Sequence, residues 1–464
     1  MLFNAPTFLF AYLPLVLAGT FLLERFAGRR ASVAGLVLAS LAFYGWDHPR
    51  RLLPILLLSV LFNFAVGRWI AARPTRLKLA IGVGGDLAAL GWFKYAGFLS
   101  GNLAALGMPV PVLHVVLPIG ISFFTFTQIA YLVDAYRGHT HRYRLLDYTL
   151  FVTFFPHLVA GPILRHDAIV PQFERGSPAL RADLGQLATG LSWFIAGLFK
   201  KVVLADGVAA FADPVFAAAS AAAPIPGADA WLGALAYALQ LYFDFSGYSD
   251  MAIGLALMLG VRFPMNFDSP YKSASLTEFW RRWHITLSRF LRDYLYIPLG
   301  GNRRGPARRL VNLFLTMLLG GLWHGAGWTF LLWGALHGAG LAINHLWRER
   351  GLAMPRLAGQ ALTLLFVVLA WVPFRAGTLG ATTTLWAAML DPAPSHGRGT
   401  GWAWVAALGA IALLLPNTGQ IFASPPGRFA WRPSAGTAVI VGAGLAIALA
   451  GSFARPSAFL YFQF

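Results

Sequence analysis

Residues 310–346 read LVNLFLTMLLGGLWHGAGWTFLLWGALHGAGLAINHL, and they contain no charged side chain. A helix needs about 20 mostly apolar residues to cross the hydrocarbon core of a bilayer. The stretch is therefore long enough for two spanning helices. At its centre, Gly325, Ala326 and Gly327 favour a break in the helix. We predict two consecutive membrane spans that meet at this break.

Apolar runs of similar length recur through the rest of the 464-residue chain. They lie near residues 6–23, 31–46, 51–70, 79–98, 113–135, 147–164, 184–206, 229–260, 357–374, 402–416 and 436–453. With 310–346 they predict about eleven to thirteen spans, because the shorter runs suit re-entrant segments equally well. No segment resembles a soluble domain. We expect an all-α polytopic membrane protein whose residues 1–464 form one membrane domain.

The composition excludes several classes of protein. Hydrophobic residues make up 58% of the chain and charged residues only 12%, against about 25% charged in ordinary globular proteins. The mean hydropathy is +0.63. The formal net charge is +18, but the basic residues are dispersed between the apolar runs, which is typical of membrane-protein loops and argues against nucleic-acid binding. Cysteine is absent, so disulfides, a cysteine nucleophile and Cys-ligated metals are excluded.

The distribution of basic residues also predicts the orientation in the membrane. No basic residue precedes the first apolar run, and the first ones, from Arg25 onward, follow it. A cleaved signal peptide has basic residues before its apolar stretch, so we expect a retained first span with the N-terminus outside. The uncharged loop at 100–111 is also expected outside. The basic loops expected in the cytoplasm are 24–30, 68–78 and 137–146.

The run 229–260 contains two carboxylates within an otherwise apolar helix. They are Asp244 and Asp250 in the sequence YFDFSGYSD. An ionisable side chain at membrane depth costs about 2.5–3.5 kcal/mol on insertion scales, so it usually faces a cavity or a partner. The sequence leaves two interpretations open, an ion pair or helix cap inside the bundle, and a functional role.

Residues 276–294 have apolar side chains at helical spacing and a basic opposite face. We predict one basic amphipathic helix of the kind that lies on anionic lipid. His284 is on its apolar side, where a histidine is more often a satisfied core residue than a catalyst. The apolar face consists of Leu276, Phe279, Trp280, Trp283, Leu287, Phe290, Leu291 and Tyr294. The polar face consists of Glu278, Arg281, Arg282, Ser288, Arg289, Arg292 and Asp293.

A stripe of polar and small residues runs along the helix that is predicted to end near Gly325. Its members are four residues apart and so share one face: Asn312, Thr316, Gly320 and His324. Small residues there either admit a neighbouring helix or open a narrow channel. In the next helix we interpret the Gly334/Gly338 pair as packing and His337 as structural.

The two histidines, His284 and His324, suggest a chemistry. Histidine is one of the few groups that exchange a proton near neutral pH, and a positioned base accelerates a reaction typically 10²–10⁴-fold. Without cysteine, acyl transfer would most simply be direct: a base takes the proton of an acceptor hydroxyl, and the oxygen attacks an activated acyl carbonyl. A metal centre is disfavoured, because no HxxxH or HExxH helix is present.

Several segments together resemble the membrane-bound O-acyltransferase (MBOAT) family, and most closely its bacterial alginate O-acetyltransferase branch. They are residues 242–271, 276–305 and 318–338, which contain WRRWH, DYLYIPLGGN and GLWHG. FFPHLVAGPILR at 154–165 is similar to the same branch. The resemblance extends from about residue 7 to about residue 375, with its motif core at about 240–340.

The resemblance implies a fold and a site. The fold is a ring of about eleven tilted transmembrane helices around a catalytic tunnel. The catalytic role is carried over to His324, and the second family position to His284. Further residues expected to line the tunnel are Asp244, Asp250, Trp280, Arg281, Arg282, Asn312, Thr316 and Trp323.

The function implied by the resemblance is membrane O-acyl transfer. An acetyl group from a cytoplasmic thioester, acetyl-CoA or another, would cross the bacterial inner membrane for O-acetylation of an alginate-like or other exopolysaccharide. The expected partners are the lipid bilayer, a periplasmic SGNH-type acetyltransferase and the polysaccharide; no permanently bound cofactor and no metal are expected. Transfer of D-alanine or another acyl group to a cell-envelope polymer stays open. A polysaccharide or lipid transporter without chemistry also stays open, although this alternative does not explain the two histidines.

Overall fold

Helices are the only regular secondary structure in the part of the chain that the structure describes. This computed structural model describes residues 1–46, 48–140, 143–174, 176–177, 179–394, 399–422, 430–454 and 459–460. Five of the described helical segments are long and apolar enough to cross a membrane: Phe8–Phe26, Arg50–Ala72, Leu184–Ser220, Arg356–Arg375 and Ala435–Phe453. The prediction of an all-α, multi-pass membrane protein is confirmed. The number of spans stays a prediction.

The chain forms two compact units. The first consists of Met1–Ala196, Ser249–Pro264 and Pro433–Val441, and the second of Gly197–Tyr248, Met265–Arg432 and Gly442–Phe464. Helices α9 (Leu184–Phe199), α11 (Gly227–Met258) and α20 (Ala435–Ala454) contribute residues to both. The expectation of one membrane domain stays a prediction.

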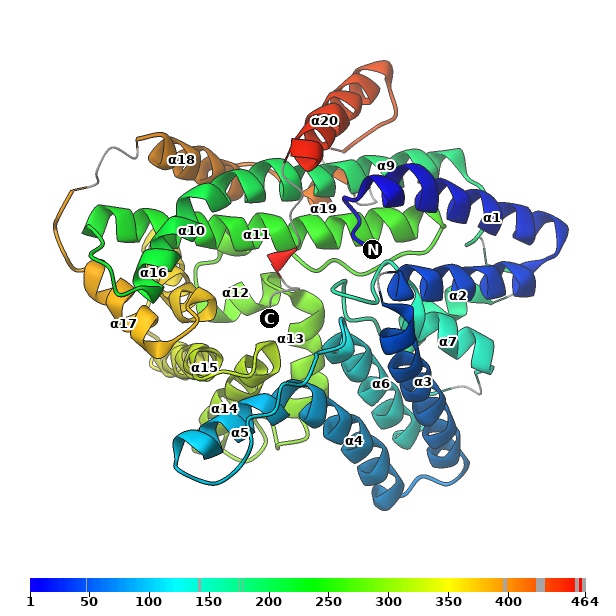
Figure 1. The fold of residues 1–464 in the computed structure, drawn as a ribbon, viewed down its shortest axis with the longest axis horizontal. Helices are drawn as coiled ribbons and strands as arrows, with labels where there is room; N and C mark the ends of the chain where they lie inside the picture. The colour runs from blue at the N-terminus through cyan, green and yellow to red at the C-terminus, as the bar shows by residue number, and fades with distance from the viewer. Residues whose placement is uncertain are drawn as a thin grey trace. The chain divides into compact units, whose positions relative to one another are not determined.

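The first unit is built mainly from the N-terminal half of the chain. Within it, α3, α4 and α6 pack side by side (Figure 1). Besides parts of the shared helices, its elements are η1 (Phe8–Tyr12), α1 (Leu13–Phe26), α2 (Arg29–Gly45), α3 (Pro49–Ala72), α4 (Arg76–Leu90), η2 (Gly91–Tyr95), α5 (Ala96–Ala105), α6 (Ile121–Tyr136), α7 (Leu145–Thr153), α8 (His166–Ile169) and η3 (Val170–Phe173).

The second unit contains the motif-rich segments. Its core gathers aromatic side chains of α11, α12, α15 and α16. Its further elements are η4 (Lys200–Ala205), α10 (Asp206–Ser220), η5 (Pro270–Lys272), α12 (Leu276–Arg282), α13 (Ile285–Leu291), η6 (Arg292–Tyr296), α14 (Pro306–His324), α15 (Trp328–Glu349), α16 (Arg356–Arg375), α17 (Leu379–Ala388), α18 (Gly399–Leu414) and α19 (Thr418–Phe422).

Three predicted runs differ from the helices found. The run at 113–135 becomes helical only at Ile121, after Gly120, whose φ of +74° favours glycine. The run at 147–164 ends as a helix at Thr153, because Pro156 disfavours helical geometry in the residue before it. The run at 184–206 instead continues as one apolar helical stretch to Ser220, through an alanine-rich sequence with high helix propensity.

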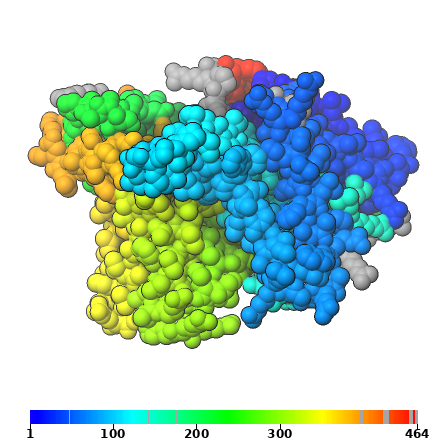
Figure 2. Space-filling view, turned by 60° about the horizontal axis from the view of Figure 1, so that its bottom comes forward, coloured from blue at the N-terminus to red at the C-terminus, as the bar shows by residue number. Residues whose placement is uncertain are grey.

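The break predicted within 310–346 is confirmed, since α14 ends at His324 and α15 begins at Trp328. The two helices pack closely, as the lime and yellow atoms of Figure 2 show. A Cβ added at Gly334 would lie 2.5 Å from the carbonyl oxygen of Met317. One added at Gly338 would lie 2.9 Å from Cα of Phe314. The interpretation of this glycine pair as packing is therefore confirmed.

We expect Gly334→Ala to destabilise the protein, because the added methyl group has no room against the backbone of α14. Overpacking of this kind costs typically about 1–3 kcal/mol. The melting temperature of the detergent-purified protein should fall accordingly. Gly409→Ala on α18 is the control, since nothing lies within 4 Å of its added Cβ, and it should melt at or slightly above the wild-type temperature. Equal melting temperatures for the two variants would contradict close packing of α14 on α15.

Candidate active site

The predicted helix at 276–294 is wrong in one respect, because it is interrupted at His284. Helix α12 ends at Arg282 and α13 begins at Ile285. His284 itself has φ 41° and ψ 56°, the left-handed region that non-glycine residues rarely adopt. The backbone N–H of Ile285 donates to the carbonyl oxygen of Asn266 at 2.9 Å. A partner far away in sequence thus supports a break that helical periodicity cannot reveal.

The side chain of Asn266 determines the tautomer of His284. Asn266 Oδ1 accepts from the backbone N–H of Thr286 at 3.2 Å and from Thr286 Oγ1 at 2.9 Å. Because a backbone N–H can only donate, this atom is the amide oxygen and not the nitrogen. Nδ1 of His284 lies 3.1 Å from the same oxygen. Nδ1 therefore carries the proton of the neutral imidazole, and Nε2 carries the lone pair.

The Nε2 atom of His284 is buried and has no hydrogen-bond partner among the described residues. The His284 side chain is fully buried. Its ring meets Phe245 edge-on, with centroids 4.7 Å apart. The segment is outside the five candidate spans, and burial lowers the pKa of His284 to about 3. The imidazole is therefore neutral and offers an unused proton-accepting nitrogen.

His324 lies at the C-terminal end of α14, where the predicted stripe ends. All four stripe residues are buried, so the face that they share is turned into the protein. Thr316 Oγ1 donates to the carbonyl oxygen of Asn312 at 2.6 Å, and Asn312 Nδ2 donates to that of Gly301 at 2.9 Å. A Cβ at Gly320 would lie 3.3 Å from Cδ1 of Leu291, so this face admits α13.

Aromatic rings surround His324. The centroid of its ring lies 4.8 Å from that of Trp323, 5.0 Å from that of Trp333 and 5.2 Å from that of Phe374. Trp323 also lies near His284, at 6.5 Å between ring centroids. Both histidine rings therefore neighbour the same indole within the second unit.

His337 packs against the aromatic rings that surround His324. Its ring lies 4.8 Å from that of Trp333. Its Nδ1 accepts a hydrogen bond from Trp280 Nε1 at 3.2 Å. These contacts are those of a packing residue, in line with the structural interpretation of His337.

A pocket of about 660 Å³ lies beside the stripe, within the second unit. Three of the predicted tunnel-lining residues, Trp280, Arg281 and Thr316, line it. Thr316 is eight residues before His324 on α14, or about 12 Å along the helix axis. The remaining lining residues are Thr277, Ile285, Ser288, Arg289, Leu291, Arg292, Tyr296, Leu313, Met317, Leu341 and His345.

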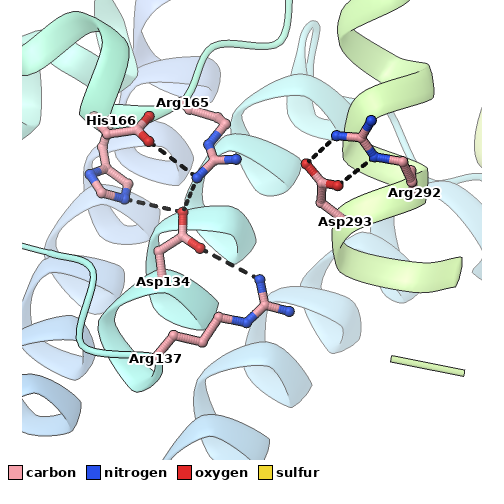
Figure 3. A network of polar contacts seen from close by, with 7 residues as sticks. Asp134, Arg137, Arg165, His166, Arg292 and Asp293 are labelled. Carbon is pink, nitrogen blue, oxygen red and sulfur yellow. Dashed lines mark hydrogen bonds and ion pairs between the residues drawn. The ribbon is translucent and has the colours of Figure 1, made fainter. Parts of the chain in front are cut away.

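Positive charge is concentrated at this pocket. Arg281 and Arg289 form no ion pair with any acidic side chain in the described ranges. Arg292 is instead held by Asp293, with Nε–Oδ1 and Nη2–Oδ2 distances of 2.7 and 3.2 Å (Figure 3). Two arginines are therefore available to an anionic ligand.

Three other predicted tunnel residues have partners elsewhere. Arg282 pairs with Glu278 at 2.9 Å, on the polar face of α12. Asp250 accepts from Trp193 Nε1 at 3.1 Å, within the first unit. Asp244 lies 2.9 Å from Nζ of Lys201. For Asp244 the contacts therefore favour the ion-pair interpretation over the functional one.

The second partner of Asp244 comes from the end of the chain. The backbone N–H of Leu460 donates to Asp244 Oδ2 at 3.1 Å. Phe459 meets Tyr248 edge-on, with centroids 4.5 Å apart, and both Phe459 and Leu460 are buried. The sequence reasoning gave this tail no role, since only the fold brings it to α11.

The first unit contains a polar network around the buried Asp134, whose Arg137, Arg165 and His166 are labelled in Figure 3. Asp134 lies 3.2 Å from His166 Nε2 and 3.4 Å from Arg165, and Arg137 approaches it at 3.8 Å. Tyr143 completes the network through a 2.8 Å contact between its hydroxyl and His166 Nδ1. Across the described ranges, no three His, Asp or Glu side chains gather as a metal ion requires.

Sequence reasoning missed residues whose roles depend on contacts distant in sequence. Asn266, Trp333 and Phe374 are the main ones at this site. Asn266 was detectable in principle, as a polar residue between the apolar residues Met265 and Phe267. What it binds could not be read from spacing.

Comparison with known proteins identifies relatives that match most of the chain. The family described as MBOAT, membrane-bound O-acyltransferase, matches residues 54–372. A probable alginate O-acetylase of Pseudomonas putida is 47% identical over 408 residues, covering 84% of this chain and 80% of that protein. The corresponding Pseudomonas aeruginosa protein is 48% identical, covering 84% and 75%. A peptidoglycan O-acetyltransferase of Helicobacter pylori is 44% identical, covering 82% and 78%.

We expect Lys201→Met to destabilise the protein strongly, because it leaves Asp244 buried without its cation. Breaking a buried ion pair by removing one partner costs about 3–5 kcal/mol. Asp244→Asn should likewise lower the melting temperature, while the acetyl transfer rate per folded molecule stays near wild type. The exposed Arg76→Met is the control for loss of a cation. An Asp244→Asn variant that melts normally but does not transfer acetyl would contradict the structural interpretation.

Proposed function

We propose that this chain, which belongs to the membrane-bound O-acyltransferase family and is a membrane O-acetyltransferase, takes its acetyl group from acetyl-CoA in the cytoplasm. It passes that group across the bacterial inner membrane for O-acetylation of an exported, alginate-like polysaccharide. The protein acts as one membrane domain, with the N-terminus in the periplasm and the basic loops in the cytoplasm. The observation that carries the proposed mechanism is the pair of buried histidines beside Trp323.

The reaction follows from the chemistry of the two imidazoles. His324 accepts the proton of the acceptor hydroxyl, and the oxygen attacks the thioester carbonyl to form a C–O bond. The C–S bond then breaks, and the proton returns to the departing thiolate. Nε2 of His284 carries the lone pair and can only accept a hydrogen bond. His284 therefore accepts a hydrogen bond from a donor group in the site. A positioned base of this kind contributes typically 10²–10⁴-fold to the rate.

The arginine pocket supports acetyl-CoA as the donor. Its phosphates are anionic, and Arg281 and Arg289 are cations without an acidic partner among the described residues. Arginine binds phosphate oxygens through paired hydrogen bonds. Thr316 in the pocket belongs to the same stripe as His324. A donor with its phosphates on the arginines would extend along this stripe toward the histidines.

A periplasmic partner of the SGNH type is the proposed recipient of the acetyl group. The donor is made in the cytoplasm, whereas an exported polysaccharide is modified on the other side. The described loops are short, and none forms a saccharide-binding domain. A serine hydroxyl on a partner is a small acceptor that fits a narrow site better than a polymer chain does.

The final acceptor has a second candidate. The Helicobacter pylori relative is named for O-acetylation of peptidoglycan, which is also a cell-envelope polymer outside the membrane. D-alanine transfer remains the alternative with a different acyl group. A transporter without chemistry is set aside, because the family and the relatives are acyltransferases.

We expect His324→Ala to abolish O-acetylation of the exported polysaccharide, because the proton of the acceptor hydroxyl then has no base. His284→Ala should lower O-acetylation severely, though not necessarily to zero. Ester content of the purified polymer is the measurement, with membrane levels of each variant followed by immunoblot. His114→Ala, an exposed histidine outside the site, is the matched control. Near wild-type O-acetylation in the His324→Ala strain would overturn the assignment.

The relay is tested by reconstitution. Liposomes that contain the purified protein receive acetyl-CoA and an alginate oligosaccharide, with or without the SGNH-type partner. We expect O-acetylated oligosaccharide only when the partner is present, because the described part of this chain forms no saccharide-binding domain. The His324→Ala protein with the partner is the control for direct transfer by the partner. Efficient O-acetylation without any partner would refute the relay and leave the acetyltransferase assignment intact.

A further inference from the structure

Asn266 occupies an unusual position in the second unit. It follows α11 in sequence and precedes α12, and its side chain is fully buried. It accepts hydrogen bonds through two oxygens. The backbone oxygen accepts from Ile285, and Oδ1 accepts from Thr286 and faces His284. One residue thus satisfies the first N–H groups of α13 and contacts the imidazole that precedes it.

We propose that Asn266 is a positioning residue of the acetyl transfer, which holds His284 in its Nδ1-protonated tautomer and so keeps the Nε2 lone pair directed into the site. This inference rests on the proposed role of His284. The Thr286 N–H can only donate, so the Asn266 atom that it contacts is the amide oxygen. That oxygen can only accept, so the nitrogen of His284 that faces it carries the proton. No proton moves on Asn266 at any step.

The geometry around His284 agrees with a functional reason for this arrangement. A left-handed backbone at a non-glycine residue is strained and persists only where the surroundings enforce it. A buried nitrogen without a partner is a second unfavourable feature at the same residue. Nε2 of His337 is also buried without a partner among the described residues, so it is the combination with the left-handed backbone that distinguishes His284. Helix capping alone explains the contacts to α13, but it does not require the imidazole.

The segments next to His284 carry other charged or titratable side chains. They are Asp244 of α11, Asp268 two residues after Asn266, Glu278, Arg281 and Arg282 of α12, Arg289 of α13 and His324 of α14. Asp244 is paired with Lys201, and Arg282 with Glu278. A pH-dependent effect that originates at position 266 therefore reports on the imidazole that contacts it.

Asn266→Asp separates the positioning role from the capping role. A carboxylate still accepts from the Thr286 N–H, so the cap of α13 remains. Opposite the Nδ1–H of His284, the negative charge favours the imidazolium and raises the pKa of His284, so that Nε2 loses its lone pair at a higher pH. We expect the acidic limb of the kcat profile to move up by about one pH unit or more, with KM for acetyl-CoA unchanged within about twofold.

Asn266→Ala and Thr286→Val complete the set. In the alanine variant, both neutral tautomers of His284 become accessible. We expect kcat to fall about 10²-fold, the scale of one general base, with little change in KM. Thr286→Val removes the hydroxyl bond to the same oxygen but leaves the backbone bond and His284 in place. It should keep the wild-type pH profile. All variants are assayed in liposomes with acetyl-CoA, the partner and oligosaccharide, and their melting temperatures are recorded.

Two results would overturn the inference. One is an Asn266→Asp pH profile that superimposes on wild type while His284→Ala is inactive; Asn266 is then only a helix cap. The other is a wild-type rate for His284→Ala, which removes the proposed role of His284 and this inference with it. If the activity of Asn266→Ala falls only in proportion to its loss of folded protein, the inference is likewise overturned, since Asn266 is then only a helix cap.

Discussion

The position of His284 depends on one interaction, in which Asn266 accepts hydrogen bonds from the first N–H groups of α13. A helix that begins inside the protein leaves its first N–H groups without intrahelical partners, and burial makes such groups costly. Asn266 meets this need with its backbone and side-chain oxygens. The chain can therefore break between α12 and α13, and His284 can adopt the left-handed conformation that places its ring against Phe245 and near Trp323.

The position of His324 depends on a different constraint, the close packing of α14 and α15. Gly334 and Gly338 let the two helix backbones approach until no Cβ would fit. Trp333, next to Gly334, then lies 5.0 Å from His324 between ring centroids. In a bilayer, where helix association relies on close packing more than on the hydrophobic effect, these small residues are what hold the aromatic shell around the imidazole.

Much of this architecture could be predicted from the sequence, for physical reasons. A run of 20 apolar residues has few alternatives to a membrane helix. The polar and small residues spaced four apart up to His324 predict that they lie on one face of that helix. The break at 325–327 follows from the glycines. The break at His284 could not be predicted, because the sequence 276–294 satisfies helical periodicity and its interruption depends on Asn266, which lies 18 residues before His284.

The same limit applies to the candidate site. Histidines on apolar faces are visible in the sequence, whereas the tautomer of one and the aromatic shell of the other arise from tertiary contacts. Asp244 illustrates the opposite case. A carboxylate in an apolar helix is typical of a functional site, but here Lys201 and the backbone of Leu460 satisfy it. The choice between these interpretations needs the partners, which spacing does not contain.

We propose that acetyl transfer takes place at the two histidines beside Trp323, with the donor held by the arginine pocket. An experimental structure with a non-hydrolysable acetyl-CoA analogue tests it most directly. We predict phosphate oxygens within hydrogen-bond distance of Arg281 and Arg289, and the acetyl carbonyl next to the His324 imidazole. An analogue bound with its acetyl group away from both His284 and His324 would contradict the account.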